Sequence, residues 1–106
     1  MRVLLDQGTP VPLRRFLTQH EVITAFERGW ARLENGHLLD AADTHGFATL
    51  VTTDMNLRYQ QNLSSRRVAI VVLTTTSWPR IHRAVELVVQ AVDAAAEGSY
   101  TEVKIP

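Results

Sequence analysis

Two aspartates follow apolar stretches of the chain, and this placement suits chemistry on phosphate groups. Asp6 comes directly after RVLL (2–5), and Asp54 ends the stretch FATLVTTD (47–54). Two carboxylates that converge can hold a hard divalent cation such as Mg²⁺, because such cations prefer oxygen ligands. An aspartate after a strand also commonly caps the next helix. Both roles stay open at this point.

The elements that would position these acids alternate between strand and helix patterns. Strands are expected at five apolar or alternating stretches, namely 2–5, 20–24, 47–54, 68–73 and 99–105. Helices are expected over three segments: around 13–17, over 37–46 with Gly46 as its cap, and from the capping residue Ser77 to Gly98.

Two of these helices carry a recognisable inward face. In the long helix after Ser77, the apolar stripe consists of Ile81, Val85, Val88 and Val92. In the helix over 37–46, the inward residues are Leu38, Leu39 and Ala42. Asp40 and Asp43 of that helix are expected to face water.

Strands alternating with helices predict a single three-layer α/β/α domain over residues 1–106, with a mostly parallel central sheet. The continuous run VAIVVL (68–73) is typical of a strand buried on both faces. Ligands bind such sheets beyond the carboxyl ends of the strands. Asp6 and Asp54 are therefore expected at the same edge of the sheet, close enough to share a cation or its waters.

Composition excludes several classes of protein. The chain has 106 residues and no cysteine, so disulfides and thiolate metal sites are excluded. Its formal net charge of zero removes the simplest argument for nucleic-acid binding. No apolar run is long enough to cross a bilayer, and MRVLLDQG lacks the features of a signal sequence. We therefore expect a cytoplasmic protein with no membrane contact. Ten of the eleven basic residues are arginine, the side chain better suited to phosphate.

Three long stretches resemble a known family. The segments MRVLLDQGTPVPLRRFL, GWARLENGHLLDAADTHGFATLVTTDMNLRYQQNL and VAIVVLTTTSWP are similar, in order and spacing, to small stand-alone bacterial PIN-like domains related to VapC ribonucleases. The resemblance covers about residues 2 to 104, and its most specific parts are the aspartate after the first strand and the LVTTD block. It implies a PIN-like domain that cleaves RNA with Mg²⁺ or Mn²⁺. It also implies a toxin role in a toxin–antitoxin system, with a cognate antitoxin as partner.

The acids of that family map unevenly onto this chain. The resemblance assigns catalytic and metal-binding roles to Asp6 and Asp54, whereas two further acidic positions fall on the amides Asn35 and Asn56. Glu34, which directly precedes Asn35, is the expected substitute ligand, and Asn35 itself is expected as a weaker metal ligand through its amide oxygen. The acidic cluster is thus depleted, and two outcomes stay open. The chain is either a metal-dependent ribonuclease or a degenerate PIN-like domain that binds nucleic acid or protein without cutting.

Polar side chains near these positions are candidate substrate contacts. The expected set consists of Thr52, Asn56, Arg58, Tyr59 and Thr74. An aromatic and an arginine beside the site could stack on a base or hold a phosphate, although the same residues also suit a polar loop and strand ends. If Trp30 and Trp78 are exposed, a homodimer surface is the first explanation, and otherwise they are core residues.

Other chemistries fit less well. The four histidines lack the paired spacing of a zinc site, and no nucleophile elbow, P-loop or dinucleotide fingerprint occurs. A phosphoacceptor domain of the receiver type also has an acid after its third strand and a hydroxyl after its fourth, here Asp54 and Thr74. That class needs a pair of acids near the first strand, and only Asp6 is present there.

Overall fold

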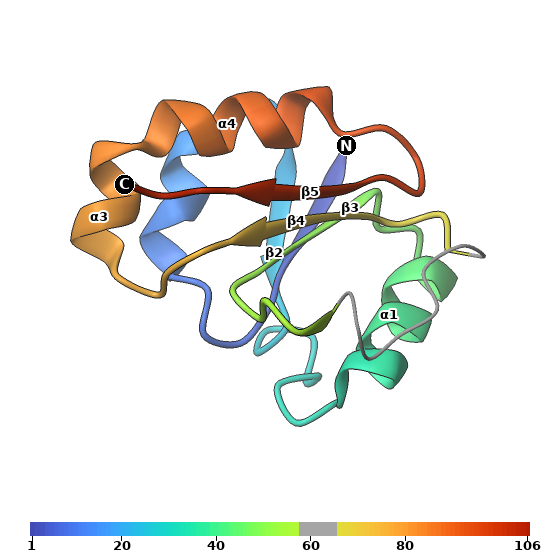
Figure 1. Cartoon of the computed structure of the whole chain (residues 1–106). Helices are drawn as coiled ribbons and strands as arrows, with labels where there is room; N and C mark the ends of the chain where they lie inside the picture. The colour runs from blue at the N-terminus through green and yellow to red at the C-terminus, as the bar shows by residue number, and fades with distance from the viewer. Residues whose placement is uncertain (58–65) are drawn as a thin grey trace.

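The computed structural model describes residues 1–57 and 66–106. Within these residues a five-stranded sheet forms the centre of the molecule (Figure 1). Its strands are β1 (Arg2–Leu5), β2 (Glu21–Thr24), β3 (Thr49–Thr52), β4 (Ala69–Leu73) and β5 (Tyr100–Val103). All neighbouring strands pair in parallel, in the order β2-β1-β3-β4-β5. This confirms the predicted α/β class and a fully parallel sheet, in the order of one doubly wound arrangement.

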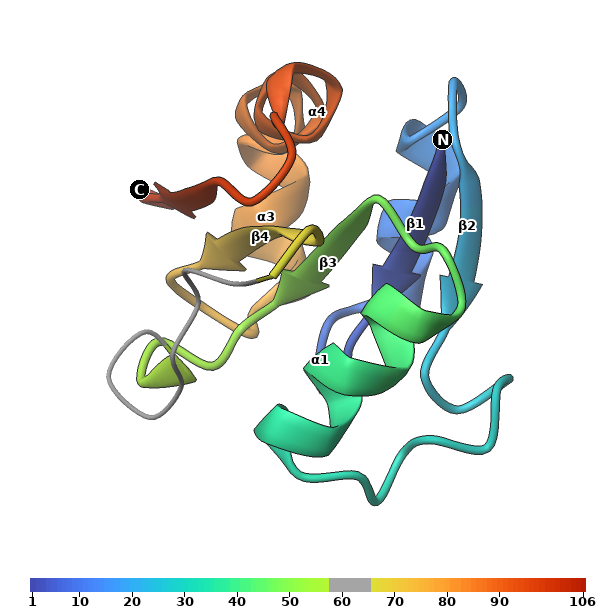
Figure 2. The same ribbon diagram turned by 90° about the vertical axis from the view of Figure 1, so that its right-hand side faces the viewer.

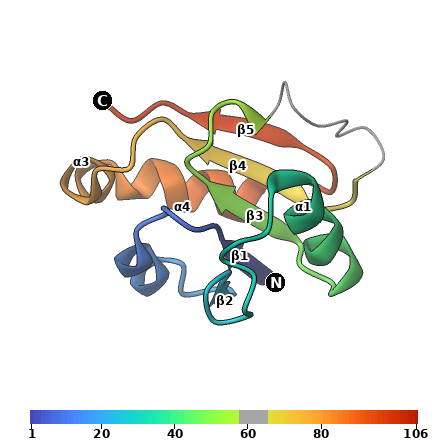
Figure 3. The same ribbon diagram turned by 90° about the horizontal axis from the view of Figure 1, so that it is seen from below.

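Helices cover both faces of the sheet. The 3-10 helix η1 (Val11–Phe16) and the α-helices α3 (Trp78–Arg83) and α4 (Val85–Ala94) pack on one face. Helix α1 (Asn35–Thr44) packs on the other. Figures 1 and 2 show the sheet between these layers, and Figure 3, seen from below, shows α1 in front of the sheet and α4 behind it. The three-layer arrangement follows from this placement.

Alternation along the strands divides the core into two halves. Side chains of a strand point to opposite faces in turn. The half under α4 takes Val3, Leu5, Val51, Val71, Leu73 and Val103 from the strands. The half under α1 takes Leu4, Leu50, Ile70 and Val72. Because the even-numbered positions of β1, β3 and β4 face α1, the residues that continue β1 and β3 on that side are Asp6, Thr52 and Asp54.

Local signals in the sequence explain several element ends. The backbone N–H of Arg80 is held by the Ser77 hydroxyl, as expected for a capping serine. Gly46 follows α1 with a φ of 75°, a left-handed conformation that suits glycine. The inward stripe of the last helical region is also confirmed, since Ile81, Val88 and Val92 are buried and the partly buried Val85 packs against the same half of the core.

Three sequence predictions were wrong in detail. The segment around 13–17 is a 3-10 helix rather than an α-helix. The helix after Ser77 is two helices, because Ala84 leaves the helical conformation (φ −113°, ψ 23°) and its N–H bonds the carbonyl of Ile81. Alanine is the strongest helix former, so its propensity gives no sign of this break.

The third error concerns Asp43, which does not simply face water. Its Oδ1 accepts a 2.8 Å hydrogen bond from the backbone N–H of Val68, just before β4. A partly buried N–H at the start of a strand needs an acceptor, and Asp43 supplies it. Asp40 is exposed as predicted, with an ion pair to Arg66.

The two tryptophans are partly buried rather than exposed. Trp78 packs against the core half under α4, and Trp30 packs against the half under α1. This placement accounts for both side chains as core residues. In the described ranges 1–57 and 66–106, no helix has the length and apolar character that crossing a bilayer requires.

Candidate functional site

The strand order reverses between β1 and β3. From β1 the chain adds β2 on one side of that strand, and it later places β3 on the other side. In open parallel sheets such a reversal leaves a crevice beyond the carboxyl ends of the two strands, where ligands bind. Asp6 follows β1 and Asp54 follows β3 by two residues. The structure thus places both predicted acids at the reversal point.

Asp6 is fixed at this point by both its backbone and its carboxylate. Its N–H extends the β1–β3 ladder with a 2.9 Å bond to the carbonyl of Val51. Its Oδ1 accepts from the N–H of Gln7 at 2.7 Å, and its Oδ2 accepts from the Thr52 hydroxyl at 2.7 Å. Burial raises the pKa of Asp6, against the lowering effect of these two hydrogen bonds, and the charge of Asp54 adds to the rise.

Thr52 connects the two acids. This residue is the last of β3 and is only 1% exposed. Its hydroxyl donates to Oδ2 of Asp6 and accepts a 3.1 Å hydrogen bond from the backbone N–H of Asp54. A hydroxyl can donate once and still accept, which allows a single oxygen to serve both partners. Thr52 was predicted as a substrate contact, but its burial makes it a residue that positions the acids.

Asp54 is held by the residues on either side of the crevice. Its Oδ1 accepts from the backbone N–H of Asn56 at 2.9 Å, which is a local turn typical of aspartate. Its Oδ2 accepts from Nδ2 of Asn35 at 2.6 Å. Asn35 is the first residue of α1, so Asp54 lies at the positive end of that helix dipole.

The two amides of the predicted site therefore behave differently. Asn35 bonds Asp54 through its side-chain amide, whereas the exposed Asn56 bonds Asp54 through its backbone N–H. An amide nitrogen, not an oxygen, of Asn35 faces the carboxylate. Turning this amide over would present its oxygen, the atom that a cation prefers.

Glu34 does not join the acids in a three-member cluster. It is the exposed N-cap residue of α1, and its side chain makes no capping hydrogen bond. Within the parts of the chain that the structure describes, no group of three or more His, Cys, Asp or Glu side chains is placed to hold a metal ion. The expected substitution of Glu34 for Asn35 as a ligand has no support in this geometry.

The remaining candidates are either used elsewhere or not described. Thr74 follows β4, and its hydroxyl accepts a 2.8 Å hydrogen bond from the N–H of Ile105, which extends the pairing of β4 with β5. Arg58 and Tyr59 lie outside the described residues. This geometry does not favour a receiver domain, because Gln7 rather than a second acid follows Asp6. The Thr74 hydroxyl also bonds the segment after β5 rather than turning toward Asp54.

The donor set around Asp6 and Asp54 nevertheless fits Mg²⁺ or Mn²⁺. The two carboxylates are hard oxygen ligands, and Asn35 would offer an amide oxygen as a third ligand only after its amide turned over, since its nitrogen now donates to Asp54. Mg²⁺ commonly keeps several waters and takes one or two carboxylates plus substrate phosphates. The shortage of acids therefore predicts weak binding that a substrate would strengthen.

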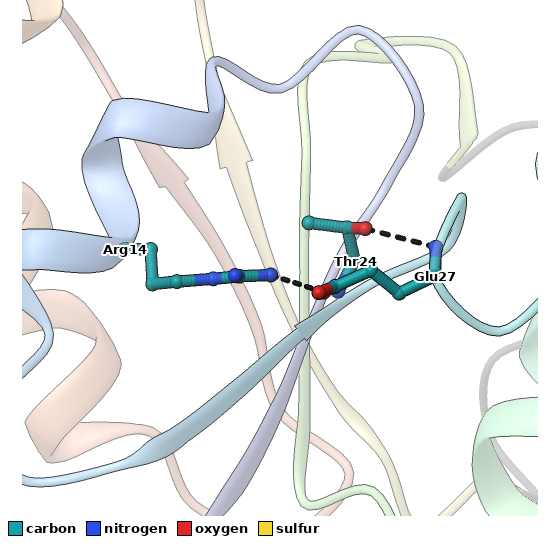
Figure 4. A network of polar contacts seen from close by, with 3 residues as sticks. All are labelled: Arg14, Thr24 and Glu27. Atoms are coloured by element: carbon teal, nitrogen blue, oxygen red, sulfur yellow. Dashed lines mark hydrogen bonds and ion pairs between the residues drawn. The ribbon is translucent and has the colours of Figure 1, made fainter.

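A neighbouring group of residues was missed by sequence reasoning. Thr24, at the end of β2, and Glu27 exchange hydrogen bonds in the pattern of a capping box, and Arg14 of η1 forms an ion pair with Glu27 (Figure 4). The spacing T-x-x-E in TAFE (24–27) was a usable signal for the turn. The approach of Arg14 depends on tertiary packing and has no local signal.

Comparison with protein-family models, with curated proteins and with solved structures gives no match for this chain.

Proposed function

We propose that this protein is a metal-dependent ribonuclease of the PIN-like type that acts from Asp6 and Asp54. The observation that carries the proposal is the shared hydroxyl of Thr52, which links both acids where the strand order reverses. The resemblance described above supplies RNA as the substrate, a toxin role and a cognate antitoxin as partner, and these parts of the proposal rest on that resemblance alone. The homodimer was tied to exposure of Trp30 and Trp78, which are partly buried, and it stays a prediction.

Asp6 and Asp54 would hold the cation, with Asn35 contributing its amide oxygen after rotation. A bound Mg²⁺ or Mn²⁺ would neutralise phosphate charge and lower the pKa of water. The protein itself supplies a fixed arrangement, because Thr52 and the turn at Asn56 restrain both carboxylates.

A second candidate is a binding domain that does not cut. It is favoured by one observation: each of the four carboxylate oxygens of Asp6 and Asp54 already accepts a hydrogen bond from the protein. A pair of acids satisfied in this way is stable without a cation. Such a site would keep the fold and the crevice while its chemistry is lost.

A cleavage assay separates the two candidates. End-labelled single-stranded RNAs of varied sequence are incubated with the purified protein in Mn²⁺, in Mg²⁺ and in EDTA. The ribonuclease proposal expects cleavage with either metal and none in EDTA. Asp54→Asn should lower the rate by more than about 100-fold, because loss of groups that merely orient a metal ligand already costs about 10–100-fold.

Asp40→Asn is the matched control. It makes the same substitution at an exposed aspartate of α1 whose partner is Arg66 rather than the crevice. This variant should cleave like the wild type. No metal-dependent cleavage by the wild type would favour the binding domain, and an unchanged rate in Asp54→Asn would show that cleavage arises elsewhere.

A further inference from the structure

A pocket lies beside the acid pair, beyond the carboxyl ends of β1 and β2. It has a volume of about 400 Å³, and its walls include Leu5, Asp6, Val11, Arg14, Phe26 and Glu27. Ligand pockets for small organic molecules begin at roughly this size. Asp6 belongs to both the pocket and the candidate metal site, so a ligand in the pocket would lie next to that site.

The aromatic wall of the pocket is Phe26, and it is largely exposed. Phe26 is 75% exposed, and Val11, the first residue of η1, is 53% exposed. Exposed aromatic rings at the rim of a pocket are typical of binding anchors.

The turn that carries Phe26 is held by several bonds. The N–H of Ala25 bonds the carbonyl of Leu5, and the N–H of Trp30 returns to the carbonyl of Ala25. Gly29 closes the turn with a φ of 76°. Phe26 is therefore presented by a fixed backbone, which reduces the entropy lost when a ligand stacks on it.

The charges of the pocket argue against a site for free phosphate. Arg14 is the basic side chain in the described lining, and it is already paired with Glu27 (Figure 4). Glu27 also accepts from the N–H of Thr24, which helps to hold it in this position. With Arg14 neutralised and Asp6 at one end, the pocket suits a flat, uncharged group rather than an anion.

We infer that this pocket binds a nucleobase of single-stranded RNA, stacked on Phe26. The inference rests on the proposed function, because it places the base next to the phosphate that Asp6 and Asp54 would act on. Base stacking on an aromatic ring tolerates any base and contributes about 1–3 kcal/mol per base. A cationic phosphate contact is available on the same turn, where the exposed Arg28 guanidinium lies 4.6 Å from the centre of the Trp30 ring.

The test measures binding in EDTA, so that it does not depend on cleavage. Fluorescence anisotropy follows a labelled single-stranded RNA and an oligomer of equal length with abasic sugars, which carries the same charge. The wild type should bind the RNA more tightly than the abasic oligomer. Phe26→Ala should weaken RNA binding by about five-fold or more and leave abasic binding unchanged. Phe26→Tyr should restore RNA binding.

Leu87→Ala is the matched control, because Leu87 is an exposed apolar residue (47%) of α4, away from the pocket lining. It should bind RNA like the wild type. Equal affinity of wild type and Phe26→Ala, equal affinity for RNA and abasic oligomers, or no RNA binding at all would overturn the inference.

Two further measurements distinguish a free nucleotide from an RNA strand as the ligand, and the pocket proposal from the ribonuclease proposal. Nucleoside 5′-monophosphates that bind as tightly as the oligomer, with the same dependence on Phe26, would identify free nucleotides instead of a strand as the ligand. Phe26-dependent RNA binding without metal-dependent cleavage would retain the pocket while rejecting the ribonuclease. Metal-dependent cleavage with no effect of Phe26→Ala on RNA binding would retain the ribonuclease and reject the pocket.

Discussion

Two corners of the sheet edge hold acids in opposite ways. At the end of β2, Glu27 has a basic partner in Arg14 and a backbone donor in Thr24, and its pKa is lowered, chiefly by that donor. Between β1 and β3, Asp6 accepts a hydrogen bond from the Thr52 hydroxyl and Asp54 accepts one from the Asn35 amide, both of them neutral donors, and burial raises the pKa of Asp6. An acid paired with arginine serves as a brace. Asp6 and Asp54 accept only from neutral donors in these hydrogen bonds, and the proposed cation would supply the positive charge that Arg14 supplies to Glu27.

The largest expected loss of stability comes from removing the threonine hydroxyl at each corner, that of Thr52 beside the acid pair and that of Thr24 beside Glu27. Thr52→Val keeps the shape of the side chain but leaves Oδ2 of Asp6 and the N–H of Asp54 without their partner. Loss of a hydrogen bond to a charged group in a buried setting should cost about 2 kcal/mol of unfolding free energy. Chemical denaturation monitored by circular dichroism measures this cost.

Thr24→Val makes the same substitution at the other corner, beside the ion pair of Glu27 and Arg14. Its hydroxyl accepts one hydrogen bond, from the N–H of Glu27, so the expected cost is that of a helix cap, about 1 kcal/mol. A Thr52→Val variant no less stable than Thr24→Val would show that Thr52 does not hold the acid pair as described.

Adding a third carboxylate to the acid pair tests its preference for a cation. Asn35→Asp removes the amide donor of Asp54 and places another negative charge beside it. Without metal the variant should melt at a lower temperature than the wild type, because like charges disfavour the folded state. Its Mn²⁺ affinity should rise at least about tenfold, the scale on which even ligand-orienting groups act.

Isothermal titration of Mn²⁺ into both proteins checks this prediction. The control is Gln90→Glu, which makes an equivalent amide-to-acid change at an exposed position of α4, on the opposite face of the sheet. If Gln90→Glu gains as much Mn²⁺ affinity as Asn35→Asp, net charge and not the crevice is responsible.

The sequence predicted the strands and the edge on which the acids lie, for physical reasons that are local. An apolar run such as 69–73 marks a strand because its consecutive residues are all buried, and Ser77 and Gly46 define helix ends through contacts within one turn. The strand order followed from no local pattern, because each strand could be placed beside several others. It was the order that put Asp6 and Asp54 at a reversal point.

Contacts between distant segments were the part that the sequence did not predict. Asn35 was expected as a weak ligand, yet its amide donates to Asp54, 19 positions away. Thr52 was expected either to contact substrate or to have a structural role at the strand end, and its burial and its hydrogen bonds to both acids favour the structural role. The pairing of Arg14 with Glu27 depends on how η1 packs beside β2. Such contacts depend on the assembled fold, whereas propensity and periodicity describe single elements.

The smallest effects concern pH, and they should have opposite signs at the two corners. The pKa of folded Asp6 is raised, so between about pH 4, its ordinary value, and that raised value the folded state binds more protons than the unfolded one. Stability therefore falls as pH rises through this window. Asp6→Asn should melt above the wild type near neutral pH and lose this advantage in acid.

The pKa of folded Glu27 is lowered, so the stability that its carboxylate contributes is present above its ordinary pKa and is lost as pH falls through the lowered pKa. Glu27→Gln should melt below the wild type near neutral pH and approach it in acid. Thermal melts of the three proteins between pH 3 and pH 8 measure both shifts, each smaller than that of Thr52→Val. Shifts of the same sign in the two variants would mean that both acids are held alike, and the distinction between brace and cation site would fail.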